Sequence, residues 1–173
     1  DAEFLVHATA RLQALGVPAP QVFGVELHDW SARLGVSRVA AAGGDADMTV
    51  GDFFDAPADG QYSAVVGNPP YIRFQDFSGD ARAKARAAAL RGGVALSGLA
   101  SSWAAFTVHG ALSLRHGGRL GFVLPAELLH ANYAAPVRRF LFENFARVDL
   151  ILFEERVVEV VRDGVSGVCG VLD

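Results

Sequence analysis

The chain has 173 residues, of which 51% are hydrophobic and 20% are charged, a composition that fits one globular domain with a core and excludes a disordered protein. Its net charge of −4 argues against a broad basic surface for nucleic acid, because affinity for DNA comes largely from Lys and Arg side chains that neutralise phosphates.

The amino-terminal segment predicts a helix, a strand and a second helix. The spacing of apolar residues indicates a helix over residues 4–15, and a short apolar run indicates a buried strand over residues 22–27. Asp29 or Ser31 can cap the next helix, which is expected to run to about residue 42.

The middle of the chain predicts two strands and a polar helix. Short strands are expected over residues 48–50 and 62–66, with Asp45 and Asp47 as loop acids ahead of the first. A helix rich in Ala and Arg is expected over residues 80–91.

The rest of the chain continues this alternation. Ser101 or Ser102 can cap a helix over residues 103–116. The elements that follow are a strand, a helix and a strand, over residues 119–124, 134–145 and 148–153. Strands that alternate with helices predict a doubly wound α/β fold, with a mostly parallel sheet covered on both faces.

The most informative stretch follows the third predicted strand. Asn68, Pro69, Pro70 and Tyr71 come directly after this short apolar run, and ligands of open α/β sheets bind at the carboxyl ends of strands. Asn68 offers a neutral carbonyl acceptor, the prolines donate no N–H, and Tyr71 offers a flat face for stacking. The alternative is a strand that leaves its sheet through a proline turn. The set suits a planar group with an amine, such as a nucleobase.

Acidic and aromatic residues close the two preceding strands. Glu26, followed by Leu27, can accept hydrogen bonds from ribose hydroxyls, although alone it is more typical of an exposed strand end. Asp52 and Phe53 suit an adenine, with the carboxylate taking the amine and the ring packing on the base; a turn acid and a core ring are the alternative. In one parallel sheet, these groups and Asn68 would share an edge.

Asn-Pro-Pro-Tyr resembles the catalytic motif of methyltransferases that act on amines with S-adenosylmethionine. The longer string Asn-Pro-Pro-Tyr-Ile-Arg-Phe-Gln is similar to adenine-specific DNA methyltransferases of restriction-modification and phage-defence systems. The resemblance implies a Rossmann-like catalytic domain over residues 1–173 that methylates the N6 amine of adenine. It implies four catalytic residues, Asn68, Pro69, Pro70 and Tyr71, and five cofactor-binding residues, Glu26, Leu27, Asp52, Phe53 and Asn68.

Departures from this family pattern lead to further expectations. Residue 1 resembles a position just after the family's glycine-rich cofactor loop, so we expect the first strand and that loop to be missing. Residues 158–173 lack the apolar strand and hairpin that should close the sheet, and no target-recognition domain follows. We therefore expect a fragment, a split subunit or a decayed gene product, which binds DNA weakly through a missing or separate recognition module and has a possible partner subunit.

Two other functions stay open. Methyltransferases that act on a protein glutamine, such as those for release factors, share Asn-Pro-Pro-Tyr, because a side-chain amide poses the same problem as a nucleophile. An RNA-modifying relative is open for the same reason. The continuation Arg73-Phe74-Gln75 favours DNA. The third reading is an inactive remnant or binding subunit, which the missing glycine loop supports.

The remaining polar residues exclude other classes of site. The five histidines show no ligand spacing and Cys169 is the only cysteine, so we expect no metal site and no internal disulfide. No apolar run approaches a membrane span and no leader opens the chain, so we expect a cytoplasmic protein. One local basic group is either a solvated helix face or a phosphate contact; it consists of Arg73, Arg82, Lys84, Arg86 and Arg91.

Overall fold

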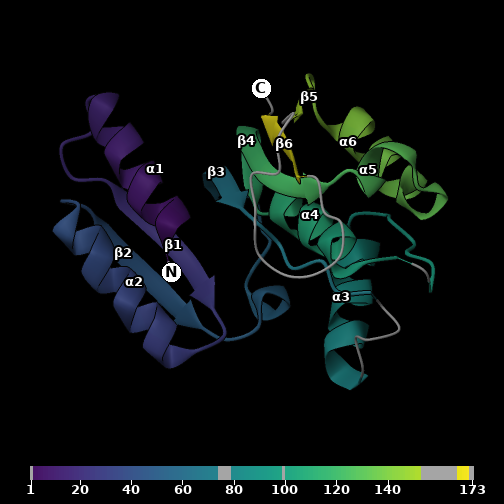
Figure 1. Cartoon of the computed structure of the whole chain (residues 1–173), viewed down its shortest axis with the longest axis horizontal. Helices are drawn as coiled ribbons and strands as arrows, with labels where there is room; N and C mark the ends of the chain where they lie inside the picture. The colour runs from purple at the N-terminus through teal and green to yellow at the C-terminus, as the bar shows by residue number, and fades with distance from the viewer. Residues whose placement is uncertain (1, 74–78, 99, 153–166, 172–173) are drawn as a thin grey trace. The chain divides into compact units, whose positions relative to one another are not determined.

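The fold was obtained as a computed structural model, which describes residues 2–73, 79–98, 100–152 and 167–171. The chain forms two compact units, Asp1–Ala56 and Pro57–Asp173, and each has its own sheet. Strands alternate with helices in both units, which confirms the predicted α/β class (Figure 1). None of the helices in the described ranges has both the length and the apolarity needed to cross a membrane.

The first unit is a helix followed by a β-α-β crossover. Its elements are α1 (Glu3–Ala14), β1 (Gln21–Glu26), α2 (Asp29–Ala41), β2 (Asp45–Val50) and the short 3-10 helix η1 (Phe53–Asp55). β1 and β2 pair in parallel, with Glu26 opposite Val50. The carboxyl ends of the two strands therefore lie together, which is the arrangement of a Rossmann-like fold.

Apolar residues of this unit pack between the helices and the two strands. Val22 and Val39 are buried. Gly24 allows Met48 to lie against β1, because a Cβ at that position would be 2.5 Å from the Met48 sulfur. A larger residue at position 24 would therefore clash with the Met48 side chain of β2.

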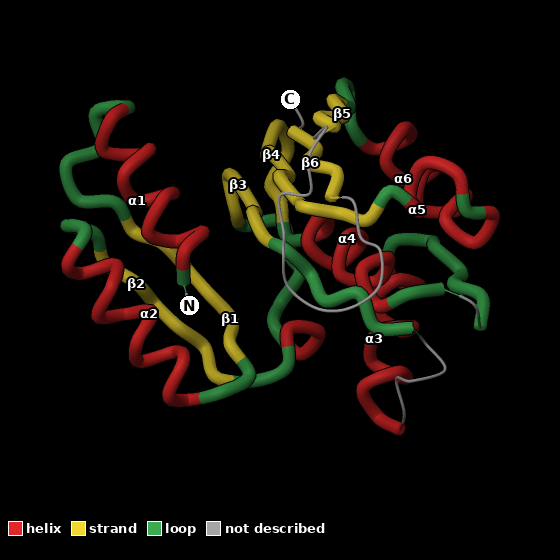
Figure 2. Tube along the Cα trace, in the orientation of Figure 1, coloured by secondary structure: helices red, strands yellow, loops and turns green. Residues whose placement is uncertain are grey.

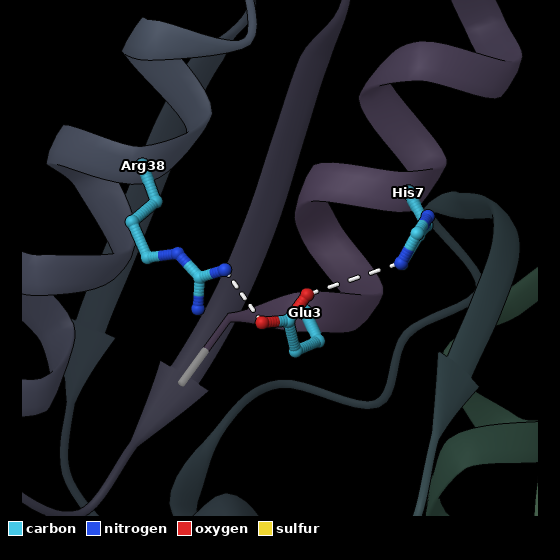
Figure 3. Close-up of polar contacts among 3 residues, drawn as sticks. All are labelled: Glu3, His7 and Arg38. Atoms are coloured by element: carbon cyan, nitrogen blue, oxygen red, sulfur yellow. Dashed lines mark hydrogen bonds and ion pairs between the residues drawn. The ribbon is translucent and has the colours of Figure 1, made fainter.

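A polar contact joins the two helices of this unit at their exposed surface (Figure 3). Arg38 of α2 donates to Glu3 Oε1 of α1 at 2.5 Å, and His7 Nε2 lies 3.8 Å from the other carboxylate oxygen. The hydrogen bond and the charge of Arg38 hold the pKa of Glu3 below its usual range. The pair joins α1 to α2, but because it is exposed to solvent it contributes little to the free energy of unfolding.

Two predictions for this unit were wrong. Asp45 and Asp47 are not loop acids, because they lie in β2 and alternate with half-buried Ala46 and Met48. Neither Asp29 nor Ser31 caps α2, since its N-cap residue is His28 and no side chain caps the helix.

The second unit holds a four-stranded sheet in the order β3–β4–β6–β5 (Figure 2). β3 and β4 are parallel, whereas β6 pairs antiparallel with both β4 and β5. The strands are β3 (Tyr62–Gly67), β4 (Leu114–Pro125), β5 (Asp149–Leu152) and β6 (Gly167–Val171). The helices are α3 (Gly79–Arg91), α4 (Ser102–Leu112), α5 (Glu127–His130), η2 (Asn132–Ala134) and α6 (Ala135–Asn144).

Helix α4 is the core of this unit. Trp103, Ala104 and Val108 are completely buried. Gly110 brings the helix close to β4, because a Cβ there would lie 2.8 Å from the ring of Phe122. A helix buried on every side has little freedom to shift, so the residues at its start occupy fixed positions.

Three sequence predictions for this unit needed correction. The helix predicted to reach residue 116 ends at Leu112, because Leu114 already pairs with Tyr62 in the sheet. Residues 158–173 do contain a sheet strand, namely β6. Ser101 is the N-cap residue of α4, but no side chain makes a capping hydrogen bond there. Residues 74–78 and 153, which border predicted elements, lie outside the described residues.

Among the described residues, β1 pairs with β2 only, and β3 with β4 only. Among these residues each sheet therefore has two edge strands, β1 and β2 in the first sheet and β3 and β5 in the second. The expectation that the family's first strand and glycine-rich loop are missing stays a prediction.

Candidate active site

The Asn-Pro-Pro-Tyr segment lies at the carboxyl end of β3. Gly67, the last residue of β3, pairs with Phe122 in β4, so Asn68 follows at the edge where two parallel strands end. Asn68 is exposed, Pro69 is buried, and Tyr71 is half-buried. The amide of Asn68 is therefore accessible, while the segment that carries it is anchored in the protein.

The hydroxyl of Tyr71 contacts the side-chain amide of Asn68 in the same segment and the backbone of the neighbouring strand β4. It lies 2.9 Å from Asn68 Oδ1 and 2.9 Å from the backbone oxygen of Val123 in β4. A phenol donates one proton, so it bonds to these acceptors one at a time. The contact orients the acceptor oxygen of Asn68, a role for Tyr71 that the stacking prediction did not include.

Burial raises the pKa of Tyr71 to about 12. Because this folded-state pKa lies above the ordinary value of 10.0, the neutral phenol stabilises the fold fully below pH 10. That contribution is lost as the pH rises from 10 towards 12. The hydroxyl is thus a proton donor to Asn68 throughout the physiological range.

We expect Tyr71→Phe to remove one late phenol titration and to reduce the loss of stability at alkaline pH. Near-ultraviolet absorbance would follow the ionisation, and urea unfolding at several pH values would follow the stability. Tyr133→Phe is the matched control, because burial and its bond to Glu127 raise that pKa to about 12 as well. If Tyr71→Phe removed a phenol that titrates near 10 instead, the described environment of Tyr71 would be wrong.

Four of the five predicted cofactor residues lie at the carboxyl edge of the β1–β2 pair. Glu26 ends β1, and its Oε1 accepts the N–H of His28 at 3.1 Å. Asp52 Oδ1 accepts the N–H of Phe54 at 3.0 Å and so caps η1. Phe53 is half-buried and Leu27 is 64% exposed, so both offer apolar surface beside the carboxylates.

The predicted alignment of Glu26, Asp52 and Asn68 along one sheet edge joins residues of the two units, and it stays a prediction. Each residue nevertheless lies at the end of a strand, as expected: Glu26 is the last residue of β1, Asp52 follows β2 after Gly51, and Asn68 directly follows β3. Within the described ranges, no group of three or more His, Cys, Asp or Glu side chains could hold a metal ion.

The sequence did not identify two sets of contacts that α4 makes in this unit. Ser101 and Ser102, interpreted as helix caps, instead donate to the backbone oxygens of Ile72 and Pro70, at the end of the Asn-Pro-Pro-Tyr segment. Arg91 of the basic group donates to Nδ1 of the buried His109 at 3.0 Å, whereas Arg86 is exposed. Serines at the start of a helix are typical of caps, so only the tertiary structure shows that Ser101 and Ser102 bond to Ile72 and Pro70.

Comparison with known proteins identifies the family. Residues 38–158 match the family described as Eco57I restriction-modification methylase, which covers more than half of the chain. The chain belongs to this family. Membership supports the cofactor expected from the sequence, S-adenosylmethionine, and the matched region includes β3, the Asn-Pro-Pro-Tyr segment and β4 of the methylase domain.

Individual relatives agree with this assignment. The Type II methyltransferase M.XhoI of Xanthomonas vasicola is 33% identical over 159 residues, which are 83% of this chain and 28% of that protein. M.PaeR7I of Pseudomonas aeruginosa is 32% identical over 109 residues, which are 63% of this chain and 18% of that protein. The chain thus spans less than a third of the length of these relatives.

Solved structures with a similar arrangement of elements include a proposed methyltransferase from Thermoplasma acidophilum. It is 12% identical, has a TM-score of 0.47, and the match covers 96% of this chain and 61% of that one. A TehB-like methyltransferase from Corynebacterium glutamicum, described as SAM-dependent, is 12% identical with a TM-score of 0.39, over 95% of this chain and 85% of that one.

Proposed function

We propose that this domain transfers a methyl group from S-adenosylmethionine to the N6 amine of adenine in DNA, as the catalytic portion of a restriction-modification methylase. The observation that carries the proposal is the oriented amide of Asn68 at the end of β3, in a chain of the methylase family. The relatives M.PaeR7I and M.XhoI are Type II methyltransferases, which supports DNA as the acceptor.

The chemistry requires two acceptors for one amine. An aromatic amine is a poor nucleophile, because its lone pair is delocalised into the ring. The side-chain oxygen of Asn68 and the backbone oxygen of Pro69 would each accept one N–H of the amine. This arrangement favours a geometry in which the lone pair points at the methyl group, and it stabilises the positive charge that develops on nitrogen.

No strong base is needed before attack. The adenine nitrogen would gain the methyl group as the sulfur leaves with the bonding electrons, and the extra proton would then pass from the nitrogen to water. Tyr71, with its pKa at about 12, holds its proton and is unsuited to act as the base near neutral pH. Its ring would stack on a base swung out of the duplex, which is worth about 1–3 kcal/mol.

The first unit would hold the cofactor. S-adenosylmethionine supplies an activated methyl group when bound. Glu26 is half-buried, and one backbone N–H occupies only part of the acceptor capacity of a carboxylate, which fits a bond to ribose hydroxyls. Asp52 would accept from the adenine amine of the cofactor, with Phe53 and Leu27 against the base.

The first experiment is a calorimetric titration with S-adenosylmethionine of the chain and of the same chain extended by a strand and a glycine-rich loop. We expect the extended chain to bind, and Asp52→Ala to weaken that binding. Absence of binding by both forms would support the inactive remnant instead.

Methyl transfer is then tested by mass spectrometry of DNA digested after incubation with the methyl donor. N6-methyladenine is the expected product. Formation of N4-methylcytosine would refute the adenine assignment, and methylation of a protein glutamine instead of DNA would favour the release-factor type of enzyme.

A further inference from the structure

Two serines at the start of α4 bond to the backbone at the end of the Asn-Pro-Pro-Tyr segment, on either side of Tyr71. Ser102 Oγ donates to the carbonyl oxygen of Pro70 and accepts the N–H of Ile72 at 3.0 Å. Ser101 Oγ donates to the oxygen of Ile72 at 3.1 Å, and the backbone N–H of Ser102 donates to the same oxygen at 2.8 Å. The bonds of the Ser102 hydroxyl therefore bracket Tyr71.

This use of the serines differs from helix capping. A capping serine accepts an N–H from the first turn of its own helix. Here both hydroxyls donate away from α4, and no side chain caps the helix. The hydroxyls hold a neighbouring segment in place.

The segment needs such an external anchor because of its prolines. Pro69 and Pro70 have no N–H, so neither can donate a backbone hydrogen bond to a neighbouring strand. Ser102 is completely buried, so water does not compete for its hydroxyl. The helix it belongs to is itself fixed by its buried neighbours Trp103 and Ala104.

We propose that Ser102 is a positioning residue for methyl transfer, which rests on the function proposed above. Its two bonds fix the backbone on either side of Tyr71, and the Tyr71 hydroxyl in turn orients Asn68 Oδ1 at 2.9 Å. Ser102 thus controls the acceptor geometry without touching the substrate. Ser101 adds a weaker hold, because the Ile72 oxygen keeps its bond from the Ser102 N–H when the Ser101 hydroxyl is removed.

The test compares Ser102→Ala with Ser102→Thr, which keeps the hydroxyl, and with Ser113→Ala. Ser113 is a matched control, because it is buried beside the other end of α4 and its hydroxyl donates to the oxygen of His109 at 3.0 Å. Two readouts are needed: hydrogen exchange at the Ile72 amide, and kcat and KM for S-adenosylmethionine with DNA as acceptor, in the chain form that methylates DNA.

For Ser102→Ala we expect roughly a 10- to 100-fold fall in kcat with little change in KM, because a small displacement of the acceptor misaligns the amine. The Ile72 amide should exchange at least about tenfold faster, since its acceptor is gone. Ser102→Thr should recover most of kcat. Ser101→Ala should have a kcat between those of the wild type and Ser102→Ala, and Ser113→Ala should match the wild type in both readouts.

Two results would overturn the inference. One is a kcat for Ser102→Ala equal to that of Ser113→Ala, and the other is an unchanged exchange rate at Ile72. A wild-type protein that transfers no methyl group would count against the proposed function instead, and the exchange at Ile72 would then decide by itself whether Ser102 holds this segment.

Discussion

Asn68→Ala is expected to lower kcat for DNA methylation by roughly 100-fold or more, because removing one preorganised electrostatic partner of a transition state typically costs this much. The side chain of Asn68 is exposed, and its amide oxygen accepts a hydrogen bond from the Tyr71 hydroxyl. In Asn68→Ala this hydroxyl can still donate to the backbone oxygen of Val123. The fold should therefore survive, and the affinity for S-adenosylmethionine should change little.

The measurement is single-turnover methyl transfer, with calorimetry for the cofactor. Asn132→Ala serves as the control, since Asn132 is an exposed asparagine of the same unit in η2. Methyl transfer by Asn68→Ala at the rate of the control would exclude Asn68 from the reaction. A large loss of cofactor affinity would mean that Asn68 belongs to the cofactor site and not to the target site alone.

Trp103→Ala is expected to have the largest effect on stability, about 3–5 kcal/mol, because it leaves a cavity the size of an indole in a packed core. Trp103 is completely buried in α4, and its ring lies 6.2 Å from that of Tyr133. The loss should appear as a lower midpoint of urea unfolding followed by circular dichroism.

The chain supplies its own control in Trp30, its second tryptophan. Trp30 is 72% exposed in α2, so Trp30→Ala should change the free energy of unfolding by less than about 0.5 kcal/mol. If the two substitutions had equal effects, α4 would not be the core that holds the start of the helix in place.

Much of the fold was predictable from local patterns. The strands β1 and β3 and the helices α1 and α3 lie within a residue or two of their predicted bounds, because each has an apolar run or a helical spacing between glycines and prolines. The position of Asn68 after β3 followed from the same reasoning. Local sequence decides such elements when burial and propensity agree.

The errors have a common physical cause, which is pairing with distant parts of the chain. Asp45 and Asp47 point outward from a strand whose partner, β1, begins more than twenty residues earlier. β6 is glycine-containing and short, and its backbone bonds to β4 and β5 determine its conformation. Leu114 extends β4 ahead of two glycines that look like a helix stop, through a shift in register opposite β3.

The residues of the candidate site were predictable from the sequence, but the hydrogen bonds that hold their backbone in place were not. A serine before a helix predicts a cap, and the sequence contains no signal that the Ser102 hydroxyl bonds to Pro70 instead. Bonds of this kind join residues about thirty positions apart, and only the tertiary structure brings the start of α4 against the segment that follows β3.

The pairing of one phenol proton with two acceptors has a kinetic consequence. Rotation about the carbon–oxygen bond of Tyr71 transfers its hydrogen bond from Asn68 Oδ1 to the oxygen of Val123, each 2.9 Å away. The oxygen of Asn68 has two lone pairs, so it can accept an N–H of an arriving amine whether or not the Tyr71 hydroxyl donates to it at that moment. Rotations of this kind take about picoseconds to nanoseconds, so the exchange between the two acceptors needs no slow opening of the fold.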